Sequence, residues 1–583
     1  MEANGLSKFR TLVLALAGLL IASTSLLWIP KITSAGAPAF STKPTYGGSI
    51  TMAWTNDFAT LDPAQWDDAQ ALAAMQSIYD TLVEYNRDNS GIGPGLATKW
   101  TIAKDGLTYT FWLRRAKFSN GDPVTAQDVA FSLDRVCQPG ANSPYAGFAF
   151  GNIKGYSELQ QAPKTSAAYT SWSSAPMPLS GVKVLGPQEL SITLVHPSAY
   201  FLNDLALLVG GIQDPAVVKR FGPGDKNSAY EDHAIGSGPF ELQSWTHNQK
   251  MVLVRNPNYW GPKPYLEQVV MLVDVNDQTA YELFQRGDVQ LILDLSPDLY
   301  QEAISNPKTA PYYHQEPENW VSFSYLDVTK PPFNNIYLRQ ALNYAVDKQQ
   351  LIKIAVNGRG YSANDGVLPP GVPGWVNSRD PYPYSLAKAK SLLAKSGHPK
   401  GLSFNFYIPA DGVDNAIAAV LQQDWKKIGV NITIKPVSTS IYWTQGASPA
   451  DGGPQTSYDA GDAGWVQDYP DPSDFMTPLL TATGPANDPA HDVFAGSNEA
   501  NYNNPKVDQL VNEANVLPPS QDKERYQLYD EAQTIVERDA PWIFEYFNVQ
   551  DALIAPTVGP SDINIYLHPI KAMQYQYMWV AKK

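Results

Sequence analysis

The sequence has only one cysteine, Cys137, among its 583 residues. An internal disulfide is therefore excluded, and the folded state must be stabilised by packing. Cys137 ends the segment Phe131 to Cys137, where a lone cysteine is more often a small buried side chain than a reactive thiol. We therefore assign Cys137 no chemistry.

Charged side chains are also scarce, and they are unbalanced in sign. They make up 17% of the chain, and the formal net charge is −15. An acidic protein repels nucleic-acid phosphates and anionic lipid headgroups, so we expect neither as a ligand of the folded part. Hydrophobic residues, in contrast, make up 44%, enough to offset the entropy of ordering a large globular body. A chain of this length exceeds one ordinary core, so we expect at least two folding units.

The motifs of common enzymes are missing. There is no His-Glu-x-x-His, no Gly-x-Ser-x-Gly and no Gly-x-x-x-x-Gly-Lys-Ser/Thr, and the two nearest histidines, His233 and His247, are too far apart to suggest a shared zinc site. Asp468 and Asp471 form a carboxylate pair, but turns and helix caps explain them more simply than acid–base chemistry. We expect no catalytic residue, no metal and no cofactor. An extracellular hydrolase is the alternative of a different class.

The N-terminus contains the one long hydrophobic run. Lys8 and Arg10 precede apolar residues from Leu12 to Pro30, and small residues follow up to Ala39. This order predicts a secretory signal peptide over residues 1–39, cut before Phe40. The run is also close to the roughly 20 residues that span a bilayer, so an uncleaved N-terminal anchor is the alternative. Either reading places the body of the protein outside the cytoplasm.

Hydrophobic periodicity predicts an α/β protein with two lobes. In the first half, Ser49 to Trp54, Leu107 to Leu113 and Val182 to Leu194 are strand-like, and Thr125 with Asp128 forms a capping pair before a helix. From Val275 onward, helical and strand patterns alternate, as in an α/β lobe. The helical segments include Leu338 to Val346, one capped by Ser385 and ending at Gly397, and Ala416 to Ile428, which precedes the strand Val430 to Ile434. Two lobes imply a cleft, which is a favoured place for a small-molecule site.

Six segments carry a resemblance to a known family, and they occur in a fixed order. They are Gly95 to Trp100 with Asp105 to Phe111 and Phe118 to Val129; Gly236 to Phe240 with Arg255 to Trp260; Pro331 to Phe333 with Leu338 to Asp347; Gly464 to Pro472; Tyr502 to Pro505; and Arg525 to Pro541. Together they resemble the family 5 extracellular solute-binding proteins, which include the dipeptide and oligopeptide receptors of ABC importers.

The resemblance implies a periplasmic-binding-protein-like fold of two α/β lobes joined by hinge strands. The first lobe is expected over residues 45–272 plus 548–583, with an extra subdomain near residues 64–195, and the second over residues 273–547. The implied partners are a short peptide and the membrane permease and ATPase subunits of an ABC importer. We expect a monomer, located in the periplasm or on the outer face of the cytoplasmic membrane.

The resemblance also implies a ligand site. In peptide-binding members the segment that matches Gly464 to Asp468 places a carboxylate against the α-ammonium of the ligand, which makes Asp468 the expected amine anchor and Trp465 a neighbouring wall. The alternative is that Asp468 only shapes the turn that ends at Pro472. Further candidates for the walls of the cleft are Trp54, Trp320 and Tyr361, although any single aromatic residue is more often part of a core.

Two departures from the family pattern leave the ligand class open. Asp327 stands where an asparagine is usual, and Gln290 stands where an acidic residue is usual. Members that resemble this family also take up sugars, opines or nickel complexes, and a fold does not determine its ligand. A short peptide is the preferred prediction, and another solute is the alternative.

Overall fold

The computed structural model describes residues 43–66, 70–87, 91–172, 174–221, 230–364, 366–377, 379–410, 412–443, 458–481, 498–567 and 573–581. The predicted signal segment, residues 1–39, lies outside the described residues. Within the described part of the chain, no helix has both the length and the apolar character that crossing a membrane requires.

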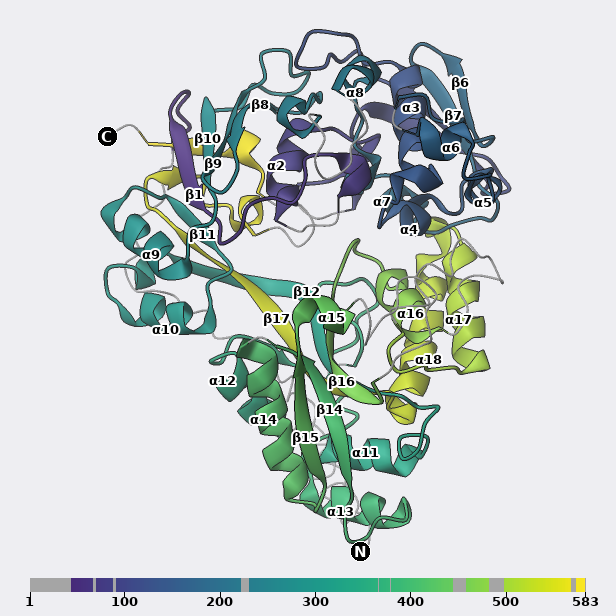
Figure 1. Cartoon of the computed structure of the whole chain (residues 1–583), viewed down its shortest axis with the longest axis vertical. Helices are drawn as coiled ribbons and strands as arrows, with labels where there is room; N and C mark the ends of the chain where they lie inside the picture. The colour runs from purple at the N-terminus through teal and green to yellow at the C-terminus, as the bar shows by residue number, and fades with distance from the viewer. Residues whose placement is uncertain are drawn as a thin grey trace, which may run out of the picture. The chain divides into compact units, whose positions relative to one another are not determined.

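The largest element of the fold is an eleven-stranded mixed sheet in the order β15-β14-β16-β12-β17-β11-β1-β10-β9-β8, with β13 paired to β17 (Figure 1). Its strands are β1 (Ser49–Ala53), β8 (Phe240–Thr246), β9 (Lys250–Arg255), β10 (Gln268–Leu272), β11 (Leu291–Leu293), β12 (Tyr313–Leu326), β13 (Tyr361–Ser362), β14 (Ser403–Pro409), β15 (Asn431–Val437), β16 (Ala460–Val466) and β17 (Trp542–Ile554).

Two long strands, β12 and β17, join the halves of this sheet. They pair antiparallel from Tyr313 opposite Leu553 to Tyr325 opposite Trp542, with irregularities between Pro317 and Val321 and between Ser322 and Phe323. One end of the pair lies beside β11, and the other end lies beside β16. In Figure 1 the two strands lie side by side along their length. They therefore have the position expected of hinge strands.

The first half of the fold carries a second, smaller sheet in the order β4-β5-β7-β6. Its strands and the accompanying hairpin are β2 (Val83–Tyr85), β3 (Ile92–Pro94), β4 (Ala97–Ile102), β5 (Thr108–Leu113), β6 (Val182–Gly186) and β7 (Glu189–Thr193). The strand-like stretch Val182 to Leu194 is thus a hairpin, because Pro187 lacks the N–H that a continuous ladder needs.

Helices α2 to α8 accompany these strands. They are α2 (Ala71–Ile78), α3 (Ala126–Val136), α4 (Ala146–Phe150), α5 (Tyr156–Gln160), α6 (Ala167–Thr170), α7 (Phe201–Asp204) and α8 (Pro215–Phe221). The predicted capping pair is confirmed, since Asp128 Oδ2 accepts a hydrogen bond from Thr125 N at 2.8 Å at the start of α3. Cys137, directly after α3, is fully buried, and burial raises the pKa of its thiol.

In the second half, helices cover both faces of the main sheet. They are α11 (Ile336–Tyr344), α12 (Lys348–Ala355), α13 (Leu386–Lys395), α14 (Gly412–Lys426), α15 (Thr439–Ile441), α16 (Ser473–Leu480), α17 (Pro505–Val516) and α18 (Asp522–Asp539). Alternate residues of β17 point to opposite faces. Trp542 and Phe544 join the core beneath α16, α17 and α18, whereas Ile543 joins the core beneath α11 to α14.

Helix caps set the starts of several of these helices. Asp347 accepts a hydrogen bond from Gln350 N at the start of α12. Ser385 accepts one from Lys388 N at the start of α13, as predicted. Gly397, which follows α13, has φ +90°, a conformation that glycine adopts without strain. Helix α14 begins at Gly412, four residues before the predicted start at Ala416.

Two helices stand beside the hinge strands. Helices α9 (Asp277–Arg286) and α10 (Pro297–Ser305) flank β11 in sequence. Strand β11 pairs with β1 on one side and with the end of β17 on the other. Tyr281, Leu299 and Leu553 share a small core here. Residues 277–305 therefore lie on the β1 side of the β12–β17 pair.

Candidate ligand-binding site

A cavity of about 730 Å³ opens where the hinge strands meet the second half of the sheet. Residues from β12, β16 and β17 line it together with residues from α12 and α14, the 357–359 loop, and Ser296 with the first residues of α10. Ligand pockets in proteins usually measure roughly 300 to 1,000 Å³. The cavity is therefore large enough to hold part of a small organic ligand.

The edge of β16 beside this cavity is open. Strand β16 pairs with β12 along its whole length, but it meets β14 only where Tyr407 lies opposite Gly461. Among the described residues, no strand pairs with this edge from Asp462 to Val466, although the carbonyl oxygen of Asp462 accepts a hydrogen bond from the Tyr442 hydroxyl at 2.7 Å. Extended backbone at a sheet edge can pair with an extended peptide, and the side chains beside it then select the residues of that peptide.

Gly464 allows the Trp320 side chain to lie close against β16. A Cβ atom at position 464 would stand 2.6 Å from Trp320 Nε1, a distance that real side chains do not reach. Trp320 itself lines the cavity, and its buried indole N–H makes no hydrogen bond within the described protein. The small residue on β16 and the large one on β12 are therefore a matched pair.

Asp468 lies just beyond the end of β16 and is half-buried. Desolvation raises the pKa of Asp468 to about 7, although a hydrogen bond from the Tyr145 side chain lowers it in part. The backbone N–H of Asp468 donates to Asp474 Oδ2 at 2.9 Å. Burial, followed by repulsion from Asp468, holds the pKa of Asp474 well above its usual range. An ammonium group would stabilise the ionised form of Asp468 in this setting.

The segment after Asp468 packs against the first half of the fold. Tyr469 is only 1% exposed and belongs to the same core as β1 and α3. Its ring stacks on Tyr200 at a centroid distance of 5.5 Å and lies 5.4 Å from Phe148. A backbone hydrogen bond from Ala199 N to Asn515 O, 2.9 Å long, joins the same two parts. Asp468 therefore lies next to a contact between the halves.

The predicted site residues do not all meet. Trp320 lines the cavity, and Asp468 lies beyond the end of the strand that borders it. Trp465 is partly buried on the other side of β16, where its Nε1 is 3.4 Å from Asp474 Oδ2. Neither Trp54 nor Tyr361 lines the cavity. Trp54 packs edge-on against Phe58 in the first core, and Tyr361 pairs with Phe547 through its backbone.

Several lining residues escaped prediction from sequence. They include Asp298, Arg359, Asp414, Trp443, Asp462 and Asn548. The alternation of a strand could have found one of them, since Asp462 and Gly464 are two residues apart and so share a face. Arg359 lies two residues before Tyr361, in the loop that leads into β13.

A polar cluster lies under the hinge side of the cavity. Arg359 Nη1 pairs with Asp551 Oδ2 at 3.0 Å, and Asn548 donates to Glu318 Oε2 at 2.8 Å. Glu545 on β17 is fully buried and accepts hydrogen bonds from Ser322 and Ser324. Burial raises the pKa of Glu318 to about 8 and that of Glu545 to about 7. In no part of the described chain do three or more His, Cys, Asp or Glu residues form a group able to hold a metal ion.

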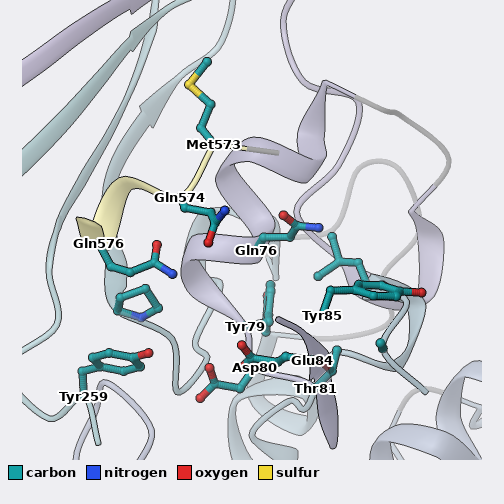
Figure 2. A pocket seen from close by; sticks show the side chains of 13 residues that line it. Gln76, Tyr79, Asp80, Thr81, Glu84, Tyr85, Tyr259, Met573, Gln574 and Gln576 are labelled. Carbon is teal, nitrogen blue, oxygen red and sulfur yellow. The ribbon is translucent and has the colours of Figure 1, made fainter. Parts of the chain in front are cut away.

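A second cavity in the first half, shown in Figure 2, is much smaller, at about 50 Å³. Gln76, Gln574 and Gln576 line it together with the carboxylate of Asp80. Asp80 Oδ2 accepts hydrogen bonds from Ser237 Oγ at 2.8 Å and from Trp260 Nε1 at 2.6 Å. A polar space of this size suits an ordered water rather than a ligand.

The comparisons with known proteins agree with this geometry. The family described as bacterial extracellular solute-binding proteins, family 5 Middle, matches residues 91–487. The heme-binding protein A of Haemophilus influenzae is 31% identical over 500 residues, which cover 83% of this chain and 84% of the relative. The periplasmic oligopeptide-binding protein OppA of Escherichia coli is 27% identical over 519 residues, which cover 86% of this chain and 88% of that protein.

A solved structure shows the same fold. The periplasmic binding protein DppA from Helicobacter pylori, in complex with the peptide STSA, aligns with a TM-score of 0.72 at 24% identity. The alignment covers 92% of this chain and 99% of that one. The expected two-lobed α/β fold is thereby confirmed. The chain belongs to family 5 of the bacterial extracellular solute-binding proteins.

Proposed function

We propose that this protein is the exported receptor of an ABC importer and that it captures short peptides between its two lobes. The observation that carries the proposal is the open edge of β16, which runs along the 730 Å³ cavity and ends next to Asp468. Such an edge offers backbone hydrogen bonds to any extended peptide, and Asp468 offers a charge-assisted bond to the amino group that every free peptide has. The names of OppA and of the STSA complex support the same ligand class.

The proposed lobes are residues 45–272 plus 548–583 and residues 273–547, with an inserted subdomain near residues 64–195. In this assignment α9, β11 and α10 belong to the second lobe in sequence but lie beside β1. Closure of the lobes on a peptide is a hinge motion that hides the ligand from water. A permease that binds the closed form would then convert ligand binding into a transport signal through a population shift.

The protein is proposed to act as a monomer and to release its ligand unaltered. Its partners are the permease and ATPase subunits of the importer, and its location is the periplasm or the outer face of the membrane. Asp468 is the proposed amine anchor, with Trp320 as a wall of the cleft. Trp465, Trp54 and Tyr361 remain weaker candidates, because none of them lines the cavity.

Native mass spectrometry of the protein purified from its host tests this proposal directly. A retained ligand reports its own mass, and the protein mass reports whether residues 1–39 are removed. We expect a bound mass that corresponds to a short peptide. Isothermal titration against a peptide mixture should then give dissociation constants of about 1 µM or tighter. A heat of binding that appears only with sugars, or only with heme, the ligand named for the Haemophilus influenzae relative, would overturn the peptide assignment.

A further inference from the structure

Carboxylates outnumber cations among the described residues that line the 730 Å³ cavity. Asp298, Asp414 and Asp462 face a single cationic side chain, Arg359. Arg359 is already paired with Asp551 and also donates to the carbonyl oxygen of Leu295, so its charge is compensated from the hinge side. The lining therefore carries more acidic than basic side chains, a composition that disfavours an anionic group and favours a cationic one.

Two of these carboxylates act on the deep part of the cavity. Asp462, on β16, is only 2% exposed, and Ser322 and Tyr546 beside it are each 3% exposed. Burial is the main cause of the raised pKa of the Tyr546 hydroxyl, followed by the charge of Glu545, and Asp462 and Asp414 add smaller contributions. Asp462 on β16, Asp414 on α14 and Tyr546 on β17 line the same cavity. Charges in such a partly desolvated space interact more strongly than charges on an open surface.

The buried acid beneath the cavity, Glu545, has a basic side chain near it, that of Lys348. Ser322 Oγ donates to Glu545 Oε2 at 2.8 Å, and Lys348 lowers the pKa of that buried acid. The ammonium of Lys348 is itself bonded to Ala363 O at 3.2 Å and does not line the cavity. The net charge that a ligand meets is thus set by the residues of the lining.

The remaining walls suit a long side chain with a charged end. Trp320 and Trp443 present indole rings, whose faces attract ammonium and guanidinium groups. Ile354, Val413 and Ile417 provide apolar surface against which the methylene groups of such a side chain can pack. Asp468 is not among the lining residues, so this cavity is separate from the proposed amine anchor.

We propose that the cavity is a subsite for a cationic side chain of the bound peptide, the ammonium of lysine or the guanidinium of arginine, with Asp462 and Asp414 as its counter-charges. The inference rests on the proposed peptide-binding function, and it names the ligand chemistry that the same cleft selects. The protein is therefore a receptor with a preference for basic peptides.

Matched peptides test the preference. Alanine tripeptides and tetrapeptides are prepared with one lysine, or with one norleucine, at each position in turn. Norleucine keeps the apolar stem and lacks the charge. Isothermal titration at low ionic strength should show that at one position the lysine peptide binds about tenfold more tightly than its norleucine partner. Added salt should reduce this ratio.

Variants assign the preference to the cavity. Asp462→Asn and Asp414→Asn should each weaken binding of the lysine peptide far more than binding of the norleucine peptide, which brings the lysine-to-norleucine ratio close to one. Asp288→Asn is the matched control, because Asp288 is an exposed acid outside the cavity, paired with Arg286. It removes the same charge and should leave the ratio intact. Should the buried Asp462→Asn variant fail to fold, the half-buried Asp414 carries the test.

The outcomes separate the two proposals. Peptide binding in which lysine is never preferred to norleucine, or a ratio that survives Asp414→Asn and Asp462→Asn, overturns the cationic subsite and leaves the peptide receptor standing. Equal losses for both peptides in the Asp462→Asn variant also count against the subsite. The absence of binding by every peptide of the set overturns the peptide receptor, and the subsite with it.

Discussion

At the scale of single residues, the environment of Asp468 determines what this carboxylate can do. The residue is half-buried, and desolvation raises its pKa to about 7. A proton therefore competes with a ligand cation for the same group near neutral pH. The ion pair with the ligand gives one prediction, and the competition with a proton gives a second.

The first prediction concerns the anchor itself. Asp468→Asn removes the charge and keeps the shape, so a peptide with a free amino group should bind roughly 10- to 100-fold more weakly. An N-acetylated copy of the peptide never had this ion pair, and its affinity should change little. Isothermal titration of both peptides checks the difference. Equal losses for the two peptides would remove Asp468 from the anchor role.

The second prediction concerns pH. Between about pH 5.5 and 7 a peptide amine stays protonated, while the ionised fraction of Asp468 rises toward one half. Affinity should therefore increase roughly tenfold across this range, and binding near neutral pH should release protons. Titrations in buffers of different ionisation enthalpy measure the protons released. The N-acetylated peptide should show neither effect, and a pH-independent affinity for the free peptide would contradict the prediction.

The same raised pKa acts on stability with a definite sign. Between the ordinary value of 3.8 and about 7, the folded protein holds a proton on Asp468 that the unfolded chain has released. The folded state binds more protons in this window, so the contribution of Asp468 to stability decreases as pH rises through it. Asp468 thus contributes least to stability at the upper end of this pH range, where its carboxylate is most ionised and can pair with a cation.

At the scale of elements, β16 combines an open edge with a close contact to β12. Its edge from Asp462 to Val466 has no strand partner in the described part of the fold, and Gly464 lies directly against Trp320. The strand therefore serves both as a template for an extended ligand and as support for one wall of the cavity. Even a small change at Gly464 should affect both roles.

Gly464→Ala tests this coupling. The added Cβ would lie 2.6 Å from Trp320 Nε1 and 3.2 Å from Val321 O, so the indole, which lines the cavity, must shift. We expect a loss of about 1 to 3 kcal/mol in the free energy of unfolding and weaker peptide binding. Denaturant unfolding and titration measure the two effects. Gly186→Ala is the control, because nothing lies within 4 Å of its Cβ position, and it should change neither quantity.

At the scale of the whole molecule, Tyr469 connects the site to the opposite half of the fold. Asp468 and Tyr469 are neighbours in sequence, yet the tyrosine ring packs with Tyr200 and Phe148 in the first core. A ligand that orders Asp468 therefore also orders the residue that joins the two halves. Such an arrangement would link occupation of the site to closure.

Tyr469→Ala should weaken this link. Loss of the stacked ring removes buried contact area between the halves, so the closed form should be less populated and peptide affinity should fall roughly tenfold. Small-angle scattering with and without peptide should show a compaction in the original protein that the variant largely loses. Tyr469→Phe keeps the ring and loses only the hydroxyl contact to Ser473. This variant should compact with peptide, and bind it, as the unsubstituted protein does. A variant that compacts fully would disprove the link.

The sequence by itself determined the family and much of the local structure of this protein. Capping residues such as Asp128, Asp347 and Ser385 act on backbone groups only three positions away, so their roles can be read from spacing alone. The family motifs are likewise local patterns of turns, caps and strand edges, and their fixed order was sufficient to predict the two-lobed fold and Asp468 as a candidate anchor.

The tertiary structure alone decided which residues share the cavity. Trp320, Arg359, Asp414 and Asp462 come from four separate segments that the pairing of β12 with β16 and β17 brings together. Composition shows that aromatic residues are abundant, but it cannot tell Trp320 in the cavity from Trp54 in a core. The physical reason is that a charge or a ring acts on its neighbours in space, and the long strand pairings that create those neighbours join residues far apart in the chain.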